Sequence, residues 1–287
     1  MSRRTLAVAF PGMSEPALWG RKRTVLDAFD RVRLARPAVR LYELALAARS
    51  DLKGRRTVAS DGLPLPPARL RTQIGPLHAD ADFFLESGRH NADLIRDLLQ
   101  EQGTSVDDVG ALLDWGCGCG RVIRHWQDLQ QTRIFGCDID QRMVTWCNEN
   151  LPFAEARMNN LSPPLPYEDG TFGLAYAFSV MTHLSQELQD AWMRELSRVL
   201  RPGGLLLIST LGEYYASRNR LTPEERASFD RGNVVVLYER SAGTSLCSAY
   251  HPAEYVRREL ARDFEHVAHR PAADDGKHDI HLLRKPT

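Results

Sequence analysis

The segment LLDWGCGCGR, residues 112–121, decides the fold. It joins an apolar, strand-like run to the glycines Gly116, Gly118 and Gly120, and a helix is expected to follow at 120–129. Glycine lets a backbone adopt positive φ and approach a bound molecule closely. In open α/β sheets, ligands bind beyond the carboxyl ends of the strands, which is where this loop would lie. The segment therefore predicts a ligand site at the end of a buried strand.

The spacing of these glycines differs from the dinucleotide-binding fingerprint. That fingerprint is G-x-G-x-x-G, and counted from Gly116 it needs a glycine where Arg121 stands. The pattern here is G-x-G-x-G, with the acidic residue Asp114 two positions before the first glycine.

Strands and helices alternate around this segment, which predicts a mostly parallel sheet covered on both faces. Ser185 is expected to cap the helix that begins there, and Pro202-Gly203-Gly204 to end it. Strands are expected at 109–116, 132–140, 153–158, 172–181 and 204–211, and helices at about 83–103, 120–129, 141–149 and 185–200.

The alternation stops after residue 211. Residues 212–250 are interpreted as an insertion, with a helix at 222–232, capped by Thr222 and Pro223, and a strand-like run at 233–240. A helix at 253–261 and two strands with hairpin-like spacing, 264–270 and 279–285, are expected to close the chain.

The formal net charge of zero conceals a division along the chain. Residues 1–72 carry 15 Lys and Arg against 6 Asp and Glu, so this segment is +9 and the remaining residues are −9. Helical spacing of apolar residues in the first part predicts a basic helical N-terminal cap or lid over residues 1–72. Residues 73–287 would then form the main α/β domain.

The composition favours a globular protein of the cytoplasm. No apolar run approaches the roughly 20 residues of a membrane-spanning helix. The first twelve residues, MSRRTLAVAFPG, have too short an apolar stretch for a convincing secretory signal. The five cysteines are odd in number and sparse, so we expect neither a disulfide framework nor a zinc site, and no metal is predicted.

With these elements in order, the chain resembles the class I S-adenosylmethionine-dependent methyltransferases. The D-x-G-x-G-x-G motif of that family is matched by Asp114, Gly116, Gly118 and Gly120, and the resemblance spans about residues 75–285. It implies a Rossmann-like sheet of seven mostly parallel strands with an antiparallel last strand, here with an added N-terminal helical segment. It also implies S-adenosyl-L-methionine as cofactor.

The resemblance also implies a set of cofactor-binding residues. The acidic residue after the second strand, Asp138, would bind the ribose hydroxyls, because a carboxylate accepts hydrogen bonds from a diol. Ile139 would pack on adenine, whereas Asp140 is interpreted as a helix cap. Arg89, in a Gly-Arg pair, would meet the cofactor's carboxylate or else lie on the surface. The implied loop contacts are Asp114, Gly116, Cys117, Gly118 and Arg121.

Two later stretches complete the expected site. Asn159, Asn160 and Leu161 stand where the family holds the adenine edge, with the choice between the two asparagines open. Phe178 and Ser179 end the fourth strand, at the point that faces the methyl group in relatives. His183 follows, either as a general base, since imidazole titrates near neutrality, or as a helix cap that lines the pocket.

These features predict an enzyme that methylates a small-molecule or peptide acceptor. The basic segment 1–72 favours an anionic acceptor, unless its arginines face solvent or pair with the acidic body. A nucleic-acid or protein methyltransferase is one alternative, although zero net charge and the lack of aromatic-basic repeats argue against nucleic acid. A non-catalytic protein that binds S-adenosylmethionine is the other. Neither a membrane partner nor a particular oligomer is predicted.

Overall fold

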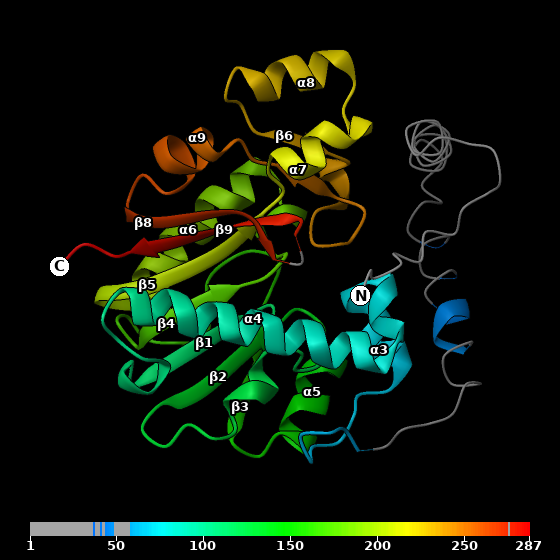
Figure 1. The fold of residues 1–287 in the computed structure, drawn as a ribbon, viewed down its shortest axis with the longest axis vertical. Coiled ribbons are helices and arrows are strands. Elements are labelled where there is room, and N and C mark those ends of the chain that lie inside the picture. The colour runs from blue at the N-terminus through cyan, green and yellow to red at the C-terminus, as the bar shows by residue number, and fades with distance from the viewer. Residues whose placement is uncertain (1–36, 38–40, 42–43, 49–57, 275) are drawn as a thin grey trace, which may run out of the picture.

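The computed structural model describes residues 37, 41, 44–48, 58–274 and 276–287. Its main feature is a seven-stranded sheet in the order β3-β2-β1-β4-β5-β9-β8 (Figure 1). Strands β1 to β5 pair in parallel, whereas β9 runs antiparallel to both β5 and β8. The predicted Rossmann-like sheet is therefore confirmed. Its strands are β1 (Ala111–Trp115), β2 (Arg133–Asp138), β3 (Ala154–Met158), β4 (Phe172–Ala177), β5 (Leu200–Thr210), β8 (Glu265–Asp274) and β9 (His278–Arg284).

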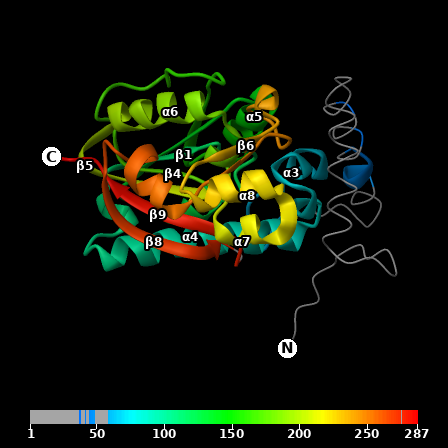
Figure 2. The ribbon, with the colours of Figure 1, turned by 90° about the horizontal axis from the view of Figure 1, so that it is seen from above.

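Helices cover both faces of this sheet, as Figure 2 shows with α4 and α6 on opposite sides. Neighbouring strand residues point to opposite faces. Accordingly Leu112 packs with Ile95 of α4, whereas Leu113 packs in the cluster that contains Leu196 of α6. Burial on both faces explains why β1 is apolar almost throughout. The helices of this domain are α3 (Ala68–Ile74), α4 (Ala81–Glu101), α5 (Gln141–Asn150), α6 (Gln186–Val199) and α9 (Ala253–Tyr255).

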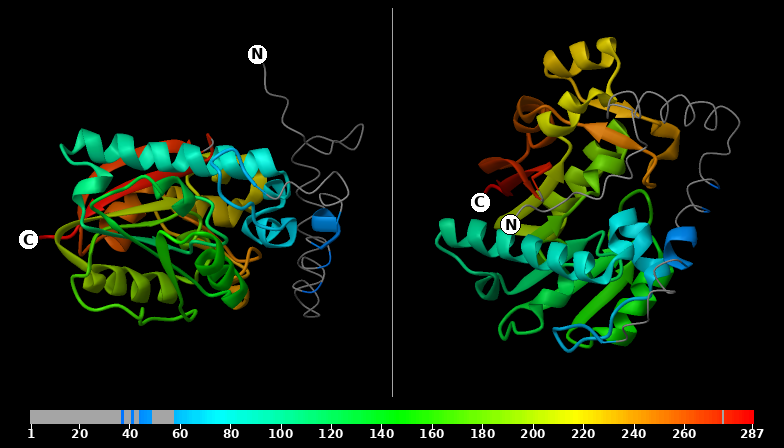
Figure 3. Two further views of the ribbon diagram at one scale, coloured as in Figure 1. Left: turned by 90° about the horizontal axis from the view of Figure 1, so that it is seen from below. Right: turned by 45° about the vertical axis from the view of Figure 1, so that its right-hand side comes forward.

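The predicted insertion folds as a small unit beside the main sheet (Figures 1 and 3). Thr222 caps its helix α8 with a capping box, because its side chain and that of Glu225 each accept the other's backbone N–H. Its strands pair antiparallel with each other and form a second, two-stranded sheet. The elements are α7 (Glu213–Tyr215), α8 (Pro223–Asp230), β6 (Val235–Leu237) and β7 (Ser248–Tyr250).

The prediction of a helix over residues 120–129 is wrong. Only a short 3₁₀ helix, η3 (Ile123–Trp126), forms there. Arg124 and Trp126 are both fully buried, with Arg124 pairing with Asp61 and Trp126 donating to Tyr176. Residues two apart do not share a face of an α-helix, so this double burial disfavours a regular helix.

Two further elements are shorter or wider than predicted. The helix expected at 253–261 starts as α9 but widens into a π-helical turn, η7 (Val256–Leu260). The strand expected at 233–240 ends early, because Tyr238 adopts a left-handed backbone with φ of 54°.

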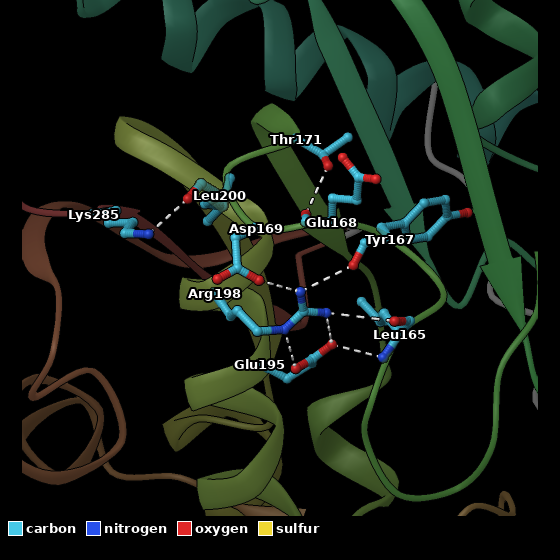
Figure 4. A network of polar contacts seen from close by, with 9 residues as sticks. All are labelled: Leu165, Tyr167, Glu168, Asp169, Thr171, Glu195, Arg198, Leu200 and Lys285. Carbon is cyan, nitrogen blue, oxygen red and sulfur yellow. Dashed lines mark hydrogen bonds and ion pairs between the residues drawn. The ribbon is translucent and has the colours of Figure 1, made fainter.

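A polar network fixes the long connection between β3 and β4 to α6 (Figure 4). Arg198 forms a two-pronged ion pair with Glu195 and donates to the carbonyl oxygens of Tyr167 and Leu165. Glu195 also accepts the backbone N–H of Leu165 at 2.6 Å. Asp169 pairs with the second terminal nitrogen of Arg198 at 2.6 Å.

The predicted N-terminal cap over residues 1–72 lies for its larger part outside the described residues. The proposed boundary at residue 72 falls inside α3. Arg71 of this helix is buried and donates to the carbonyl oxygens of Pro66, His78 and Ala79, so it ties α3 to the turn that follows. Across the part of the chain that the structure describes, no helix is long and apolar enough to span a bilayer.

Candidate active site

A cavity of about 700 Å³ opens at the carboxyl ends of β1, β2 and β4. Its size lies within the range of small-molecule sites. Three further segments form the walls: α3 with the turn after it, the insertion around residues 243–246, and the β8–β9 hairpin. Among the predicted residues, those that line the cavity are Gly116, Gly118, Arg121, Asp138, Ile139, Asn159, Asn160, Leu161, Phe178, Ser179 and His183.

The glycine-rich loop forms the floor, and each glycine of the motif has positive φ. A Cβ atom at Gly116 would lie 2.4 Å from a methyl group of Val180, and one at Gly120 would lie 2.5 Å from Leu151. Side chains are therefore excluded at both positions. The Gly116 and Cys117 amides both donate to the Cys137 carbonyl, at 2.8 and 3.0 Å, which fixes the loop to β2.

Asp114 and Cys117 do not line the cavity but lie buried beneath the loop. Tyr176 donates to the Asp114 carboxylate at 3.0 Å and in turn accepts from the Trp126 indole at 2.7 Å. Burial raises the pKa of Asp114 to about 7. Its place in the structure indicates support of the loop rather than direct contact with a ligand.

Asp138 lies at the end of β2 with its carboxylate at the cavity wall. One oxygen accepts the Gly118 amide at 2.9 Å and the other accepts the Asp140 amide at 2.8 Å. A carboxylate offers about four lone-pair sites, so Asp138 can accept further hydrogen bonds from a ligand. Asp140 caps α5, as predicted, by accepting the Arg142 amide. Ile139 lines the cavity and is 44% exposed, so it is open to packing by a ligand.

The two asparagines after β3 differ sharply. Asn159 is buried, donates to the Asn160 carbonyl at 2.7 Å, and leaves its own side-chain oxygen without a hydrogen-bond partner. Asn160 is exposed. Because buried polar atoms are almost always satisfied, the Asn159 oxygen marks a place for a ligand donor, such as an exocyclic amino group.

Arg121, and not Arg89, brings a guanidinium to the cavity. Arg89 is exposed on α4 and does not line the cavity. Its neighbour Gly88 lets α4 approach the loop, because a Cβ there would lie 2.0 Å from the Arg121 carbonyl oxygen. Arg121 donates to the side-chain oxygen of Asn91 at 3.0 Å when that amide is oriented to satisfy its neighbours.

The far side of the cavity carries Ser179 and His183. Ser179 has φ of 59°, a left-handed conformation that is uncommon for serine, and its amide donates to the Ser209 hydroxyl at 2.7 Å. His183 Nδ1 lies 2.7 Å from the Cys247 carbonyl oxygen, and burial lowers the pKa of the ring. Since a carbonyl only accepts, the Nδ1 of neutral His183 carries the proton.

Asp274 and His278 also line the cavity, although neither is among the predicted cofactor-binding or catalytic residues; the sequence offers His278 only as a weak candidate for the acceptor wall. They stand on either side of the β8–β9 turn, and no motif or period of the sequence marks them. The pairing of β9 with β5 brings them to the site.

A second polar cluster lies on β8 and β9. Within the described residues, His269, Asp279 and His281 are close enough to share an ion. Their atoms are already engaged, however, since His269 contacts Asp279 at 2.9 Å and His281 contacts Thr210 and His266. We therefore assign no metal to this cluster.

Comparisons with known proteins agree with this geometry. A family model described as a methyltransferase domain matches residues 113–208. The chain is 34% identical over 112 residues to a probable S-adenosylmethionine-dependent methyltransferase of Mycolicibacterium smegmatis, covering 39% of this chain and 42% of the relative. It is 29% identical over 152 residues to trans-aconitate 2-methyltransferase of Azoarcus, covering 50% and 55%. The chain thus spans about half the length of these curated relatives.

The fold is similar to that of 1,6-didemethyltoxoflavin-N1-methyltransferase from Burkholderia thailandensis. The TM-score is 0.52 at 15% identity, and the match covers 86% of this chain and 90% of the other. Fold and site together define a Rossmann-like ligand-binding domain. Residues 113–208 match a methyltransferase domain, and the chain is similar to S-adenosylmethionine-dependent methyltransferases, whose cofactor is S-adenosyl-L-methionine.

Proposed function

We propose that this protein binds S-adenosyl-L-methionine and transfers its methyl group to a small-molecule or peptide acceptor. The observation that carries the proposal is the unpartnered, buried side-chain oxygen of Asn159. It lines the same cavity as the Asp138 carboxylate and the side-chain-free glycine loop. These groups match the needs of an adenosyl ligand: an acceptor for the adenine amino group, a carboxylate for the ribose diol, and close backbone approach.

When bound, the cofactor supplies a methyl group that is already activated on a sulfonium sulfur. The protein therefore contributes chiefly by positioning the two reactants. Asp138 would hold the ribose, Asn159 the adenine edge, and Ile139 the adenine face. Arg121 is the cavity-lining cation that we assign to the cofactor's carboxylate.

We propose an acceptor that carries an anionic group. Arg69 and Lys277 line the cavity and support this choice. We propose the cytoplasm as the compartment, which is supported by five cysteines that are all unpaired and buried. Neither a nucleic acid nor a membrane surface is part of the proposal.

Calorimetry with S-adenosylhomocysteine tests the proposal. We expect Asp138→Ala to weaken binding by about 100-fold or more, because a hydrogen bond to a charged group contributes about 1.5–3 kcal/mol and the ribose offers two donors. Circular dichroism should show that the variant is folded. Asp128→Ala, which changes an exposed carboxylate outside the cavity, is the matched control and should bind normally.

Three results would refute or change the proposal. Unchanged affinity in Asp138→Ala would refute the ribose assignment. Absence of binding by the unaltered protein would refute the cofactor and with it the enzyme. Tight RNA binding that weakens steeply with salt would instead favour a nucleic-acid acceptor.

A further inference from the structure

Three polar side chains from different elements meet at one wall of the cavity. Ser179 follows β4, Asp274 ends β8, and His278 begins β9. His278 Nε2 lies 3.5 Å from the Ser179 hydroxyl oxygen, and His278 Nδ1 lies 3.5 Å from Asp274 Oδ2. All three residues line the cavity, so the histidine is placed between a buried carboxylate and the ligand space.

Asp274 is fixed on its other side. Asn91 of α4, with its amide oriented to satisfy its neighbours, donates to Asp274 Oδ1 at 2.8 Å. The same amide accepts from Arg121, so the carboxylate is linked to the cation of the cofactor pocket. This arrangement leaves Asp274 Oδ2 directed toward His278, and the Asp274 side chain is 10% exposed.

The carboxylate determines where neutral His278 holds its proton. A carboxylate only accepts hydrogen bonds, so the Nδ1 that faces it must carry the hydrogen. Nε2 is then an unprotonated acceptor, and it is the nitrogen on the side of Ser179 and the cavity. A distance of 3.5 Å is long, but such contacts are often long before a substrate is bound.

His78 and His183, the other two histidines that line the cavity, are less suited to take up a proton; burial lowers the pKa of His78 to about 3. The Nδ1 of His183 faces the neutral carbonyl of Cys247, whereas that of His278 faces an anion. An imidazolium is stabilised far better by a carboxylate than by a carbonyl. Burial also lowers the pKa of His183.

We propose that His278 is the general base of the reaction, positioned by Asp274, and that the methylated atom of the acceptor is a hydroxyl oxygen. This inference rests on the proposed function. The O–H bond of the acceptor breaks and its proton passes to His278 Nε2. The oxygen's electron pair forms the new O–CH₃ bond while the C–S bond of the sulfonium breaks, and that bond's electrons stay on sulfur. A thioether, the methyl ether and a protonated His278 remain, and His278 returns its proton to water.

The first test needs no acceptor. Long-range ¹H–¹⁵N spectra of the full chain, saturated with S-adenosylhomocysteine at pH 8, report which nitrogen of His278 is protonated. We expect the Nδ1–H tautomer, and we expect Asp274→Asn to lower the measured pKa of His278. The opposite tautomer, or a pKa indifferent to Asp274→Asn, would overturn the proposal.

The second test uses catechol as a hydroxyl acceptor, and the reaction is measured by the release of S-adenosylhomocysteine. Loss of a general base typically costs 10²–10⁴-fold, so we expect His278→Gln to lower kcat by about 100-fold or more near neutral pH. The loss should shrink at high pH, where catechol ionises unaided. A loss that is equal at every pH would show that His278 only shapes the wall and would overturn the proposal.

His183→Gln is the matched control, and we expect it to leave the pH profile unchanged in shape. If His183→Gln instead produces the pH-dependent loss, His183 is the general base, as the sequence predicts, and the proposal for His278 is wrong. Calorimetry distinguishes a failure of the His278 proposal from a failure of the proposed function, because His278→Gln should bind S-adenosylhomocysteine normally. Absence of binding by the unaltered protein refutes the proposed function itself. Should catechol not be methylated, the tautomer measurement decides the role of His278.

Discussion

The role of Asn159 can be assigned only once the surroundings of its side chain in the fold are known. The sequence places two asparagines after the third strand, and either side chain has the chemistry to accept from an amino group. The fold buries Asn159 with an unpartnered oxygen, whereas Asn160 is exposed at the cavity wall. An unsatisfied buried acceptor costs free energy that a bound donor would recover.

We therefore expect Asn159→Ala to weaken binding of S-adenosylhomocysteine by about tenfold, as the loss of one hydrogen bond of about 1–1.5 kcal/mol predicts. Asn160→Ala should leave the affinity within about twofold, because of the two only the Asn159 side chain holds a buried oxygen that lacks a partner. Isothermal calorimetry on both variants measures the difference. An equal effect of the two substitutions would contradict the assignment of the adenine edge to Asn159.

At the scale of elements, the sequence predicts best where a pattern acts locally. The strands from β1 to β5, the long helix α4 and the caps at Ser185 and Thr222 follow from periodicity and capping chemistry, and all are present. The expected start of the fifth strand at residue 204 is wrong, because β5 begins at Leu200 and Pro202-Gly203-Gly204 lie within it. The predicted helix over 120–129 does not form, because its side chains contact residues that are distant in the sequence. Arg124 turns toward Asp61, and this contact is invisible in the local pattern.

The site residues also fall into those that a local motif predicts and those that only the fold brings to the cavity. Asp138 follows from its position after a strand and a family motif, and its side chain does line the cavity. Asp274 and His278 follow from no spacing, since the β8–β9 hairpin, which lies beside β5 at one edge of the sheet, brings them to Ser179. Arg89 carries the charge expected of a cofactor contact, yet the helix turns it outward.

The network of Arg198 gives a prediction about an element rather than the site. Glu195 is 7% exposed and Arg198 30% exposed, and together they hold the connection before β4 to α6. We expect Arg198→Ala to destabilise the protein by about 2 kcal/mol, because a buried carboxylate loses its partner. Urea unfolding measures this change.

The matched control for Arg198 is Arg257→Ala. Its ion pair with Glu254 joins side chains that are 46% and 55% exposed, and such pairs contribute less than about 1 kcal/mol. A loss in Arg198→Ala no greater than that in Arg257→Ala would show that the network does not stabilise the connection.

Across the whole molecule, buried titratable groups set the response to acid. Burial lowers the pKa of His251 and His125 to about 4, of His78 to about 3 and of His281 to about 2. Each is held neutral in the folded state and protonates near its usual 6.5 when unfolded. Their contribution to stability is therefore present above pH 6.5 and is lost as the pH falls below it. Burial of Asp114 has the opposite effect, because its raised pKa favours the folded state as pH falls from 7 toward 4.

We expect the free energy of unfolding to fall between pH 7 and pH 5, since four histidines each lose about 2 kcal/mol and Asp114 returns about 2 kcal/mol. Urea unfolding at pH 7, 6 and 5 measures the slope. His251→Gln should make the slope shallower by about 2 kcal/mol over this range, whereas Asp114→Asn should make it steeper by a similar amount. These opposite signs distinguish neutral buried histidines from a general loss of surface charge pairs, which would leave both variants with the slope of the unaltered protein.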